Sequence, residues 1–156
     1  MERVEAEIDG GSRSIEALLG VRPTTFAYPC GQSFVGRAES RTSYVPVVAR
    51  RFVAARGYAG ETANDPWRCD LAHLEAFVVD GLGADALMSL AHGDGAGGRW
   101  VVMAGHDVGD GGGQTVLVRA LDALCRRLAR LPVWCAPVRE VALHLRQLRA
   151  REPART

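Results

Sequence analysis

The sequence predicts an α/β domain with a parallel sheet, and three features of its 156 residues indicate this class. Short β-branched and aromatic runs alternate with longer segments of helical periodicity, the pattern of consecutive βα units. The composition, 47% hydrophobic and 24% charged, is that of one folded domain. The run 100–104 is apolar throughout, as in strands buried on both faces. We assign residues 1–149 to this domain and 150–156 to a frayed tail.

The first part of the chain predicts a helix, a strand and a tight loop. An amphipathic helix over residues 4–19 is expected, because its apolar residues share one face and Gly20 is a typical stop. The β-prone run 24–28 then enters the loop Pro29-Cys30-Gly31. The sequence therefore places this loop at the carboxyl end of a strand.

The middle of the chain predicts a second helix and further strands. Pro46 can open a helix at Val45 that Gly57 closes, and a short strand at 58–59 follows. A polar loop through residues 64–66 leads to another β-type run, 77–79.

The last part repeats the alternation of helix and strand. Residues 84–91 are helical by pattern, and the strand 100–104 runs directly into Gly105-His106-Asp107. Thr115 is a plausible N-cap for a long helix over 116–130. A strand at 133–135 and a closing helix over 138–149 complete the set.

Charge and cysteine patterns exclude several classes of function. All 19 basic residues are Arg, which excludes chemistry that needs a catalytic or phosphate-binding lysine. Residues 116–156 carry nine arginines against three acidic residues, but at a helical spacing typical of solvated helix faces rather than of a nucleic-acid site. The four cysteines lack the spacings of a zinc finger, so reduced thiols are expected.

The sequence also predicts where the chain resides. No apolar run approaches the roughly 18 residues of a membrane span, and the first residues lack the apolar core of a signal peptide. We expect no membrane span, no nucleic-acid partner and a cytoplasmic location, unless a signal peptide lies upstream of Met1.

Two loops that directly follow strands carry reactive side chains, Cys30 in one and His106 in the other. Parallel α/β proteins gather functional groups at this end of the sheet. His106 is a candidate general acid or base, because imidazole titrates near neutral pH. The alternatives are a purely structural loop histidine, or a metal-independent hydrolase that pairs Cys30 with His106 and an orienting acid such as Asp107.

Several blocks in order resemble the C-terminal part of the polysaccharide deacetylase, or NodB-homology, family over about residues 7–148. The resemblance implies an incomplete TIM-like β/α barrel that removes N- or O-acetyl groups from a polysaccharide or oligosaccharide. It also implies a divalent metal, usually zinc, that activates water. The blocks that carry the resemblance are Ile15–Gly20, Phe26–Gly31, Ala54–Gly57, Trp100–His106 and Val133–Val141.

The resemblance assigns roles to individual residues. His106 matches the histidine that protonates the leaving group, and the backbone amide of Cys30 matches an oxyanion donor. Tyr28 belongs to the same groove wall as Cys30. Asp65 and Trp67 are loose matches to two further pocket residues.

The same resemblance also implies what this stretch lacks. The family's blocks that hold the catalytic base and the metal ligands have no counterpart here, and Ala27 stands where many members carry an Arg. The chain therefore resembles the C-terminal portion of a deacetylase domain, nearly inert alone, whose sheet edges a missing N-terminal segment or a partner would cover. A non-catalytic carbohydrate-binding or interaction fragment is the alternative.

Overall fold

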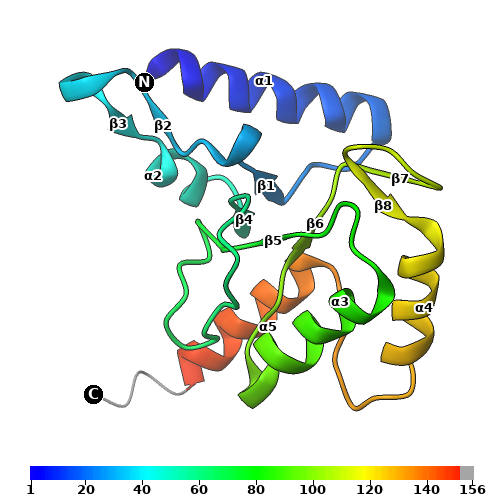
Figure 1. The fold of residues 1–156 in the computed structure, drawn as a ribbon. Helices are drawn as coiled ribbons and strands as arrows, with labels where there is room; N and C mark the ends of the chain where they lie inside the picture. The colour runs from blue at the N-terminus through cyan, green and yellow to red at the C-terminus, as the bar shows by residue number, and fades with distance from the viewer. Residues whose placement is uncertain (152–156) are drawn as a thin grey trace.

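The computed structural model describes residues 1–151, and within them the chain is a mixed α/β fold with five α-helices and several short strands (Figure 1). The expected tail at 150–156 is helical through Arg151, and residues 152–156 lie outside the described part. The helices are α1 (Glu2–Leu19), α2 (Val45–Ala49), α3 (Ala84–Ser89), α4 (Val118–Leu128) and α5 (Val138–Arg151). The strands are β1 (Thr25–Ala27), β2 (Phe34–Val35), β3 (Thr42–Ser43), β4 (Ala54–Arg56), β5 (Phe77–Val78), β6 (Met103–Ala104), β7 (Asp107–Gly109) and β8 (Thr115–Leu117).

Within residues 1–151 the strands form four two-stranded sheets, three of them parallel, and the third parallel pair is β7 with β8. β1 pairs with β4, and β5 pairs with β6, both in parallel. A parallel bridge from Arg56 to Leu74 links β4 to the segment that enters β5. The amide of Gly81, just after β5, donates to the carbonyl of Thr115 in β8. The antiparallel hairpin of β2 and β3 stands apart from this series.

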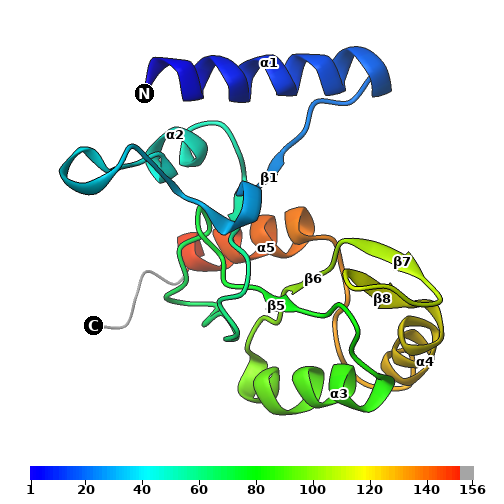
Figure 2. The same cartoon turned by 45° about the horizontal axis from the view of Figure 1, so that its top comes forward.

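The two faces of these strands are covered by different helices, because successive side chains of a strand point to opposite faces. Ala55 packs with α2, and Phe77 and Val79 pack with α3 and α4. Figure 2 shows α5 on the other side of β5 and β6 from α3. The residues that pack on the α5 side are mostly small, and they are Ala54, Leu74, Ala76, Val102 and Ala104.

An ion-pair network fastens α1 to the end of α2. The guanidinium of Arg51 donates to both carboxylate oxygens of Asp9, at 2.7 and 3.0 Å, and to Glu5 at 3.0 Å. Such a bidentate arrangement fixes the orientation of both side chains. Beneath it, Val4 and Ile8 pack on the aromatic cluster around Tyr44.

Several predicted elements are confirmed in position. The first helix ends at Gly20, which adopts the left-handed conformation with φ of 68°. The helices expected at 84–91 and 138–149 are α3 and α5. The strands expected at 24–28, 77–79 and 100–104 are present as the shorter β1, β5 and β6.

The prediction of a helix from Val45 to Gly57 is wrong in its second half. The helix α2 ends at Ala49, and residues 54–56 form β4 against β1. Ala54 and Ala55 are buried on opposite faces of the sheet, and this tertiary burial overrides the helical preference of alanine. Residues 58–59 consequently follow the strand as a bend and form no strand of their own.

Two predictions near the C-terminal end are also wrong. Thr115 is no N-cap: it is a buried residue of β8, and α4 begins at Val118. Residues 133–135 form no strand, and Val133 and Trp134 are about half exposed. The ring of Trp134 instead packs edge-on against His144 of α5, with centroids 5.1 Å apart. The sequence pattern did not predict the hairpin of β2 and β3 or strand β7.

The side chain of Asn64 joins the segments that enter β5 and β6. Its Oδ1 accepts the amide of Glu75 at 3.0 Å, and its Nδ2 donates to the carbonyls of Glu75 and Trp100 at 3.0 and 3.2 Å. The backbone of Asn64 also forms an antiparallel bridge with Trp100. Because Asn64 is only 4% exposed, water cannot easily replace these bonds.

Within residues 1–151, no helix has both the length and the apolar character needed to cross a membrane.

We predict that Asn64→Ala lowers the free energy of unfolding by about 1–3 kcal/mol, since it leaves the buried amide of Glu75 without an acceptor. Urea denaturation followed by circular dichroism measures the change. The matched control is Gln114→Ala, which removes an exposed amide and should change stability by less than about 0.5 kcal/mol. Equal stability of the two variants would refute the role given to Asn64.

Candidate functional site

Asp80 and His106 face each other where β5 and β6 end. The parallel register pairs Phe77 with Met103 and Val78 with Ala104, so two residues further on it brings Asp80 opposite His106. Asp80 Oδ2 lies 2.7 Å from His106 Nδ1, and Asp80 Oδ1 accepts the backbone amide of His106 at 3.0 Å. Both carboxylate oxygens are therefore engaged by one residue.

The surroundings of this pair determine its protonation. The Asp80 side chain is 7% exposed, whereas that of His106 is 42% exposed. Two hydrogen bonds, from the His106 amide first and from its ring second, hold the pKa of Asp80 below its ordinary value. The carboxylate is consequently an acceptor, which makes Nδ1 of His106 the protonated ring nitrogen and leaves Nε2 free. The neutral ring can thus accept a proton at Nε2, and the charged ring can donate one.

A glycine between Ala104 and His106 lets β8 approach the site closely. A methyl group at Gly105 would collide with the side chain of Val116 and would lie 3.2 Å from Asp80 Oδ1. Any other residue at this position would push apart β8 and the Asp80 loop. The Asp80–His106 pair therefore depends on the absence of a side chain at Gly105.

Tyr58 connects the pair to the loop that carries Cys30. Its ring stands nearly perpendicular to the His106 ring, with centroids 5.4 Å apart. A methyl group at Gly31 would lie 3.2 Å from both Cβ and the carbonyl oxygen of Tyr58. The structure therefore brings the loop 29–31 and His106 to the same end of the sheet, on two sides of one tyrosine.

Cys30 occupies an exposed, left-handed position in a short 3-10 turn, with φ of 50°. The amides of its neighbours are used: Tyr28 donates to Arg56, and Gly31 donates to Tyr28. No acceptor within residues 1–151 takes the amide of Cys30. This N–H is therefore available to a ligand, as an oxyanion donor would need to be.

Tyr28 lies in the core and not on an open groove. It is 2% exposed, packs on Phe26 and Tyr44, and donates from its hydroxyl to the carbonyl of Ala72 at 2.7 Å. Burial raises the pKa of its hydroxyl above the ordinary range. Tyr28 thus supports the loop 29–31 from below, and Tyr58 is the tyrosine that meets His106.

Asp65 and Trp67 lie close to each other, in a turn where the amide of Trp67 donates to Asp65 Oδ1 at 2.8 Å. The preceding residue, Asn64, pairs with Trp100, six positions before His106. At about 3.3 Å per residue of extended chain, this separates the turn from His106 by roughly 20 Å. The structure therefore does not bring Asp65 and Trp67 to the Asp80–His106 pair.

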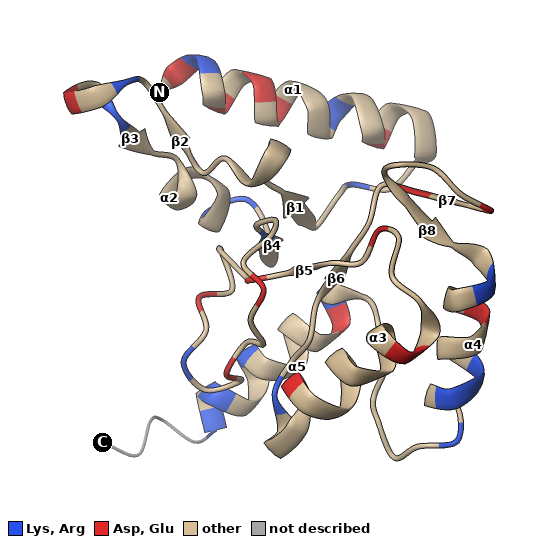
Figure 3. Ribbon diagram, in the orientation of Figure 1, with Lys and Arg blue, Asp and Glu red and all other residues tan. Residues whose placement is uncertain are grey.

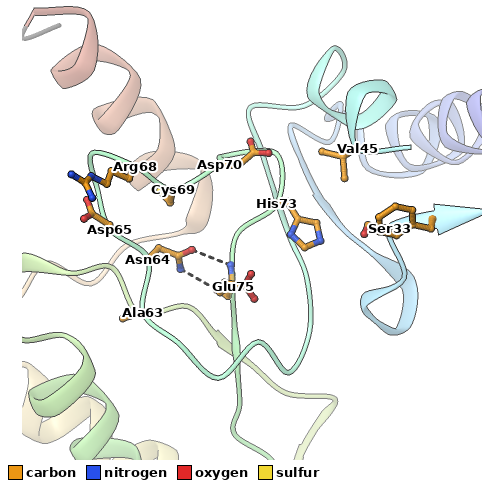
Figure 4. Close-up of a pocket in the computed structure, with 11 residues that line it drawn as sticks. Ser33, Val45, Ala63, Asn64, Asp65, Arg68, Cys69, Asp70, His73 and Glu75 are labelled. Carbon is orange, nitrogen blue, oxygen red and sulfur yellow. Dashed lines mark hydrogen bonds between the residues drawn. The ribbon is translucent and has the colours of Figure 1, made fainter. Parts of the chain in front are cut away.

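The turn of Asp65 instead borders an open pocket of about 540 Å³ (Figure 4). Figure 4 shows the loop 63–75 on one side and Ser33 and Val45 on the other. The groups that reach the pocket include the carboxylates of Asp70 and Glu75 and the ring of His73. A smaller pocket of about 380 Å³ lies between Trp67 and residues 96–99.

Acidic and basic residues are segregated along the fold (Figure 3). The loops of the middle of the chain are mainly acidic, whereas basic residues gather on α4 and α5. Among residues 1–151, no three His, Cys, Asp or Glu side chains converge as they would to hold a metal ion. The divalent metal that the family resemblance implies stays an expectation about the complete family domain.

No protein-family model, curated protein or solved structure matches this chain. The geometry of the Asp80–His106 pair is consequently the observation from which a function can be argued.

The sequence analysis missed Asp80 and Tyr58. A signal for Asp80 was present, because it directly follows the predicted strand 77–79 just as His106 follows 100–104. Parallel strands place such residues at one edge, so the two loops could have been paired. Tyr58 had no such signal, since it was assigned to a strand that does not form.

We predict that the pair adds a pH-dependent contribution to stability. Since the pKa of Asp80 is lowered by folding, its contribution is complete above the unfolded carboxyl value of about 3.9 and disappears as pH falls through the lower folded value. Asp80→Asn should therefore be less stable than the wild type near neutral pH, and the difference should shrink below about pH 4. Urea denaturation at several pH values measures this.

The control is Asp110→Asn, an exposed carboxylate on the neighbouring loop, which should leave stability nearly unchanged. If the difference in free energy of unfolding between Asp80→Asn and the wild type stays constant down to pH 2, Asp80 is not ionised in the folded protein as we assign it.

Proposed function

We propose that this chain carries the acid–base part of a hydrolase site of the polysaccharide deacetylase type, acting on an acetylated polysaccharide or oligosaccharide. The observation that carries the proposal is the Asp80–His106 pair, with Nδ1 held at 2.7 Å and Nε2 free. The ordered sequence blocks that resemble the family supply the reaction class. The His106 side chain is 42% exposed, so a substrate can approach it from solvent.

His106 supplies the proton to the leaving group in this proposal. Asp80 fixes Nδ1 as the protonated nitrogen and stabilises the positive charge when Nε2 is protonated as well. The charged ring then donates from Nε2 to the departing amine or alcohol oxygen. The free amide of Cys30, on the other side of Tyr58, is available to the developing oxyanion.

No step of this proposal passes through a metal ion. The resemblance implies a divalent metal, but residues 1–151 contain no three converging side chains that would hold one. The roles of His106 and Asp80 rest on the two hydrogen bonds between them, and the role of Cys30 rests on its free backbone amide.

The incomplete TIM-like barrel is the architecture that we propose with this function. It is supported by the order of the parallel contacts: β1 pairs with β4, β4 bridges to the segment that enters β5, and β5 pairs with β6, with the β2–β3 hairpin inserted between β1 and β4. One helix differs from that plan: α5 covers the face that a closed barrel turns inward, whereas α2, α3 and α4 cover the outer one.

A metal-independent cysteine hydrolase is the second candidate. The observation in its favour is that Cys30 is exposed on the same side as His106. The Nδ1 atom of His106 is already oriented by the carboxylate of Asp80. In that mechanism the thiol of Cys30, and not only its amide, would be required. Alkylation of the thiol therefore distinguishes the two candidates.

We predict that His106→Ala abolishes the slow hydrolysis of a chromogenic acetyl ester or an acetylated oligosaccharide that we expect of this chain alone, because a general acid usually contributes about 10²–10⁴-fold to the rate. The assay measures acetate release by the full chain. His144→Ala is the matched control, because that exposed histidine packs on Trp134 and should leave turnover unchanged.

The same assay separates the alternatives. Cys30→Ser should retain most activity if only the amide acts, and should lose it if the thiol is the nucleophile. Equal turnover of His106→Ala and wild type would remove His106 from the mechanism. If the wild type binds the oligosaccharide without releasing acetate, the carbohydrate-binding alternative replaces the hydrolase.

A further inference from the structure

The contacts of Tyr58 differ from those of an ordinary surface tyrosine. The residue is half buried and its side chain packs with Ala76, Val102 and Ala104 on the α5 face of the sheet. Its ring meets His106 at an interplanar angle of 77°, and its backbone lies against Gly31. Tyr58 thus packs on the sheet and contacts both reactive loops, His106 through its ring and Gly31 through its backbone and Cβ.

The hydrogen bond to Asp80 does not by itself prevent rotation of the His106 side chain. One bond at Nδ1 holds the imidazole ring, and rotation about the Cα–Cβ and Cβ–Cγ bonds can carry Nδ1 away from Asp80 and move Nε2. The flanking Gly105 has no side chain, and the His106 side chain is 42% exposed. The perpendicular ring of Tyr58 is packed so that it opposes this rotation.

Tyr58 is itself held in place from two directions. Below it, the small side chains of Ala76 and Ala104 allow its ring to pack against the sheet. Beside it, Gly31 lacks the Cβ that would crowd the Tyr58 carbonyl, so the turn of Cys30 closes onto the tyrosine. The orientation of the ring is therefore set by the sheet and not by the mobility of an exposed loop.

We propose that Tyr58 is a positioning residue that fixes the plane of the His106 ring and holds the Cys30 turn at a constant separation from it. The inference rests on the proposed function for its catalytic meaning. The proposed role of Tyr58 does not require its hydroxyl, for which the described residues offer no hydrogen-bond partner. Removal of the ring should therefore matter, and removal of the hydroxyl should not.

The decisive experiment compares Tyr58→Phe with Tyr58→Leu by ¹⁵N nuclear magnetic resonance of the histidine rings. Phe keeps the ring, whereas Leu keeps apolar volume in the cluster without a ring, and circular dichroism shows that both variants fold. In the wild type and Tyr58→Phe, the neutral ring of His106 should be protonated at Nδ1. In Tyr58→Leu, the ratio of the Nδ1 to the Nε2 tautomer should fall at least about twofold, because the bond to Asp80 is intermittent.

Phe34→Leu is the control, since it exchanges an exposed ring outside this contact and should not alter the His106 signals. An unchanged tautomer ratio in folded Tyr58→Leu overturns the proposal. An equal fall of the tautomer ratio in Tyr58→Phe and Tyr58→Leu overturns the proposal as well, because the hydroxyl would then be the acting group.

A kinetic measurement completes the test. Acetate release by Tyr58→Leu should show a kcat lower by roughly 10- to 100-fold with little change in KM, the loss expected when a reacting group is misplaced. Tyr58→Phe should restore the wild-type kcat. If no version of the chain releases acetate, the proposed function fails, while the tautomer ratio still decides whether Tyr58 orients His106.

Discussion

The parallel register between β5 and β6 decides the composition of the candidate site. It pairs Phe77 with Met103, and the same offset of 26 residues sets Asp80 against His106. A slip of one residue would turn one of the two side chains to the opposite face of the sheet. The register is fixed by burial, since Phe77 must reach the core under α3 and α4. The pairing of Asp80 with His106 therefore follows from the packing of Phe77, three residues before Asp80.

The two tyrosines near the Cys30 turn illustrate how position in the sheet separates a structural role from a site role. Tyr28 continues β1 toward the α2 side, where it is buried and its hydroxyl is bonded to Ala72. Tyr58 follows β4 on the α5 side, where its ring remains within contact of His106. The turn at Cys30 therefore rests on one tyrosine and closes onto the other.

Much of the fold could be predicted from local sequence, because α1, β1, β5, β6 and α5 each carry their own periodicity and end signals. Elements decided by tertiary contacts could not. Ala54 and Thr115 have helical or capping preferences, yet each is buried in a strand by its neighbours. For the site, His106 and Cys30 were visible as residues after strands. Asp80 carried the same signal, whereas its exact position opposite His106 depends on the register of β5 and β6, and Asp65 with Trp67 belongs to a distant turn.

The placement of α5 has a consequence for the order in which the chain can fold. Every strand of the sheet precedes this helix in the sequence, yet Ala54, Leu74 and Val102 bury their α5-facing side only when Val138 and Ala142 arrive. A chain emerging from the ribosome therefore exposes a bare apolar sheet until residue 142 or beyond has been synthesised. The arginines of α5 then secure it, Arg146 to the carbonyl of Val53 and Arg149 to that of Pro66. Translation rate and chaperone capture act during this interval, so both bear on the yield of folded protein.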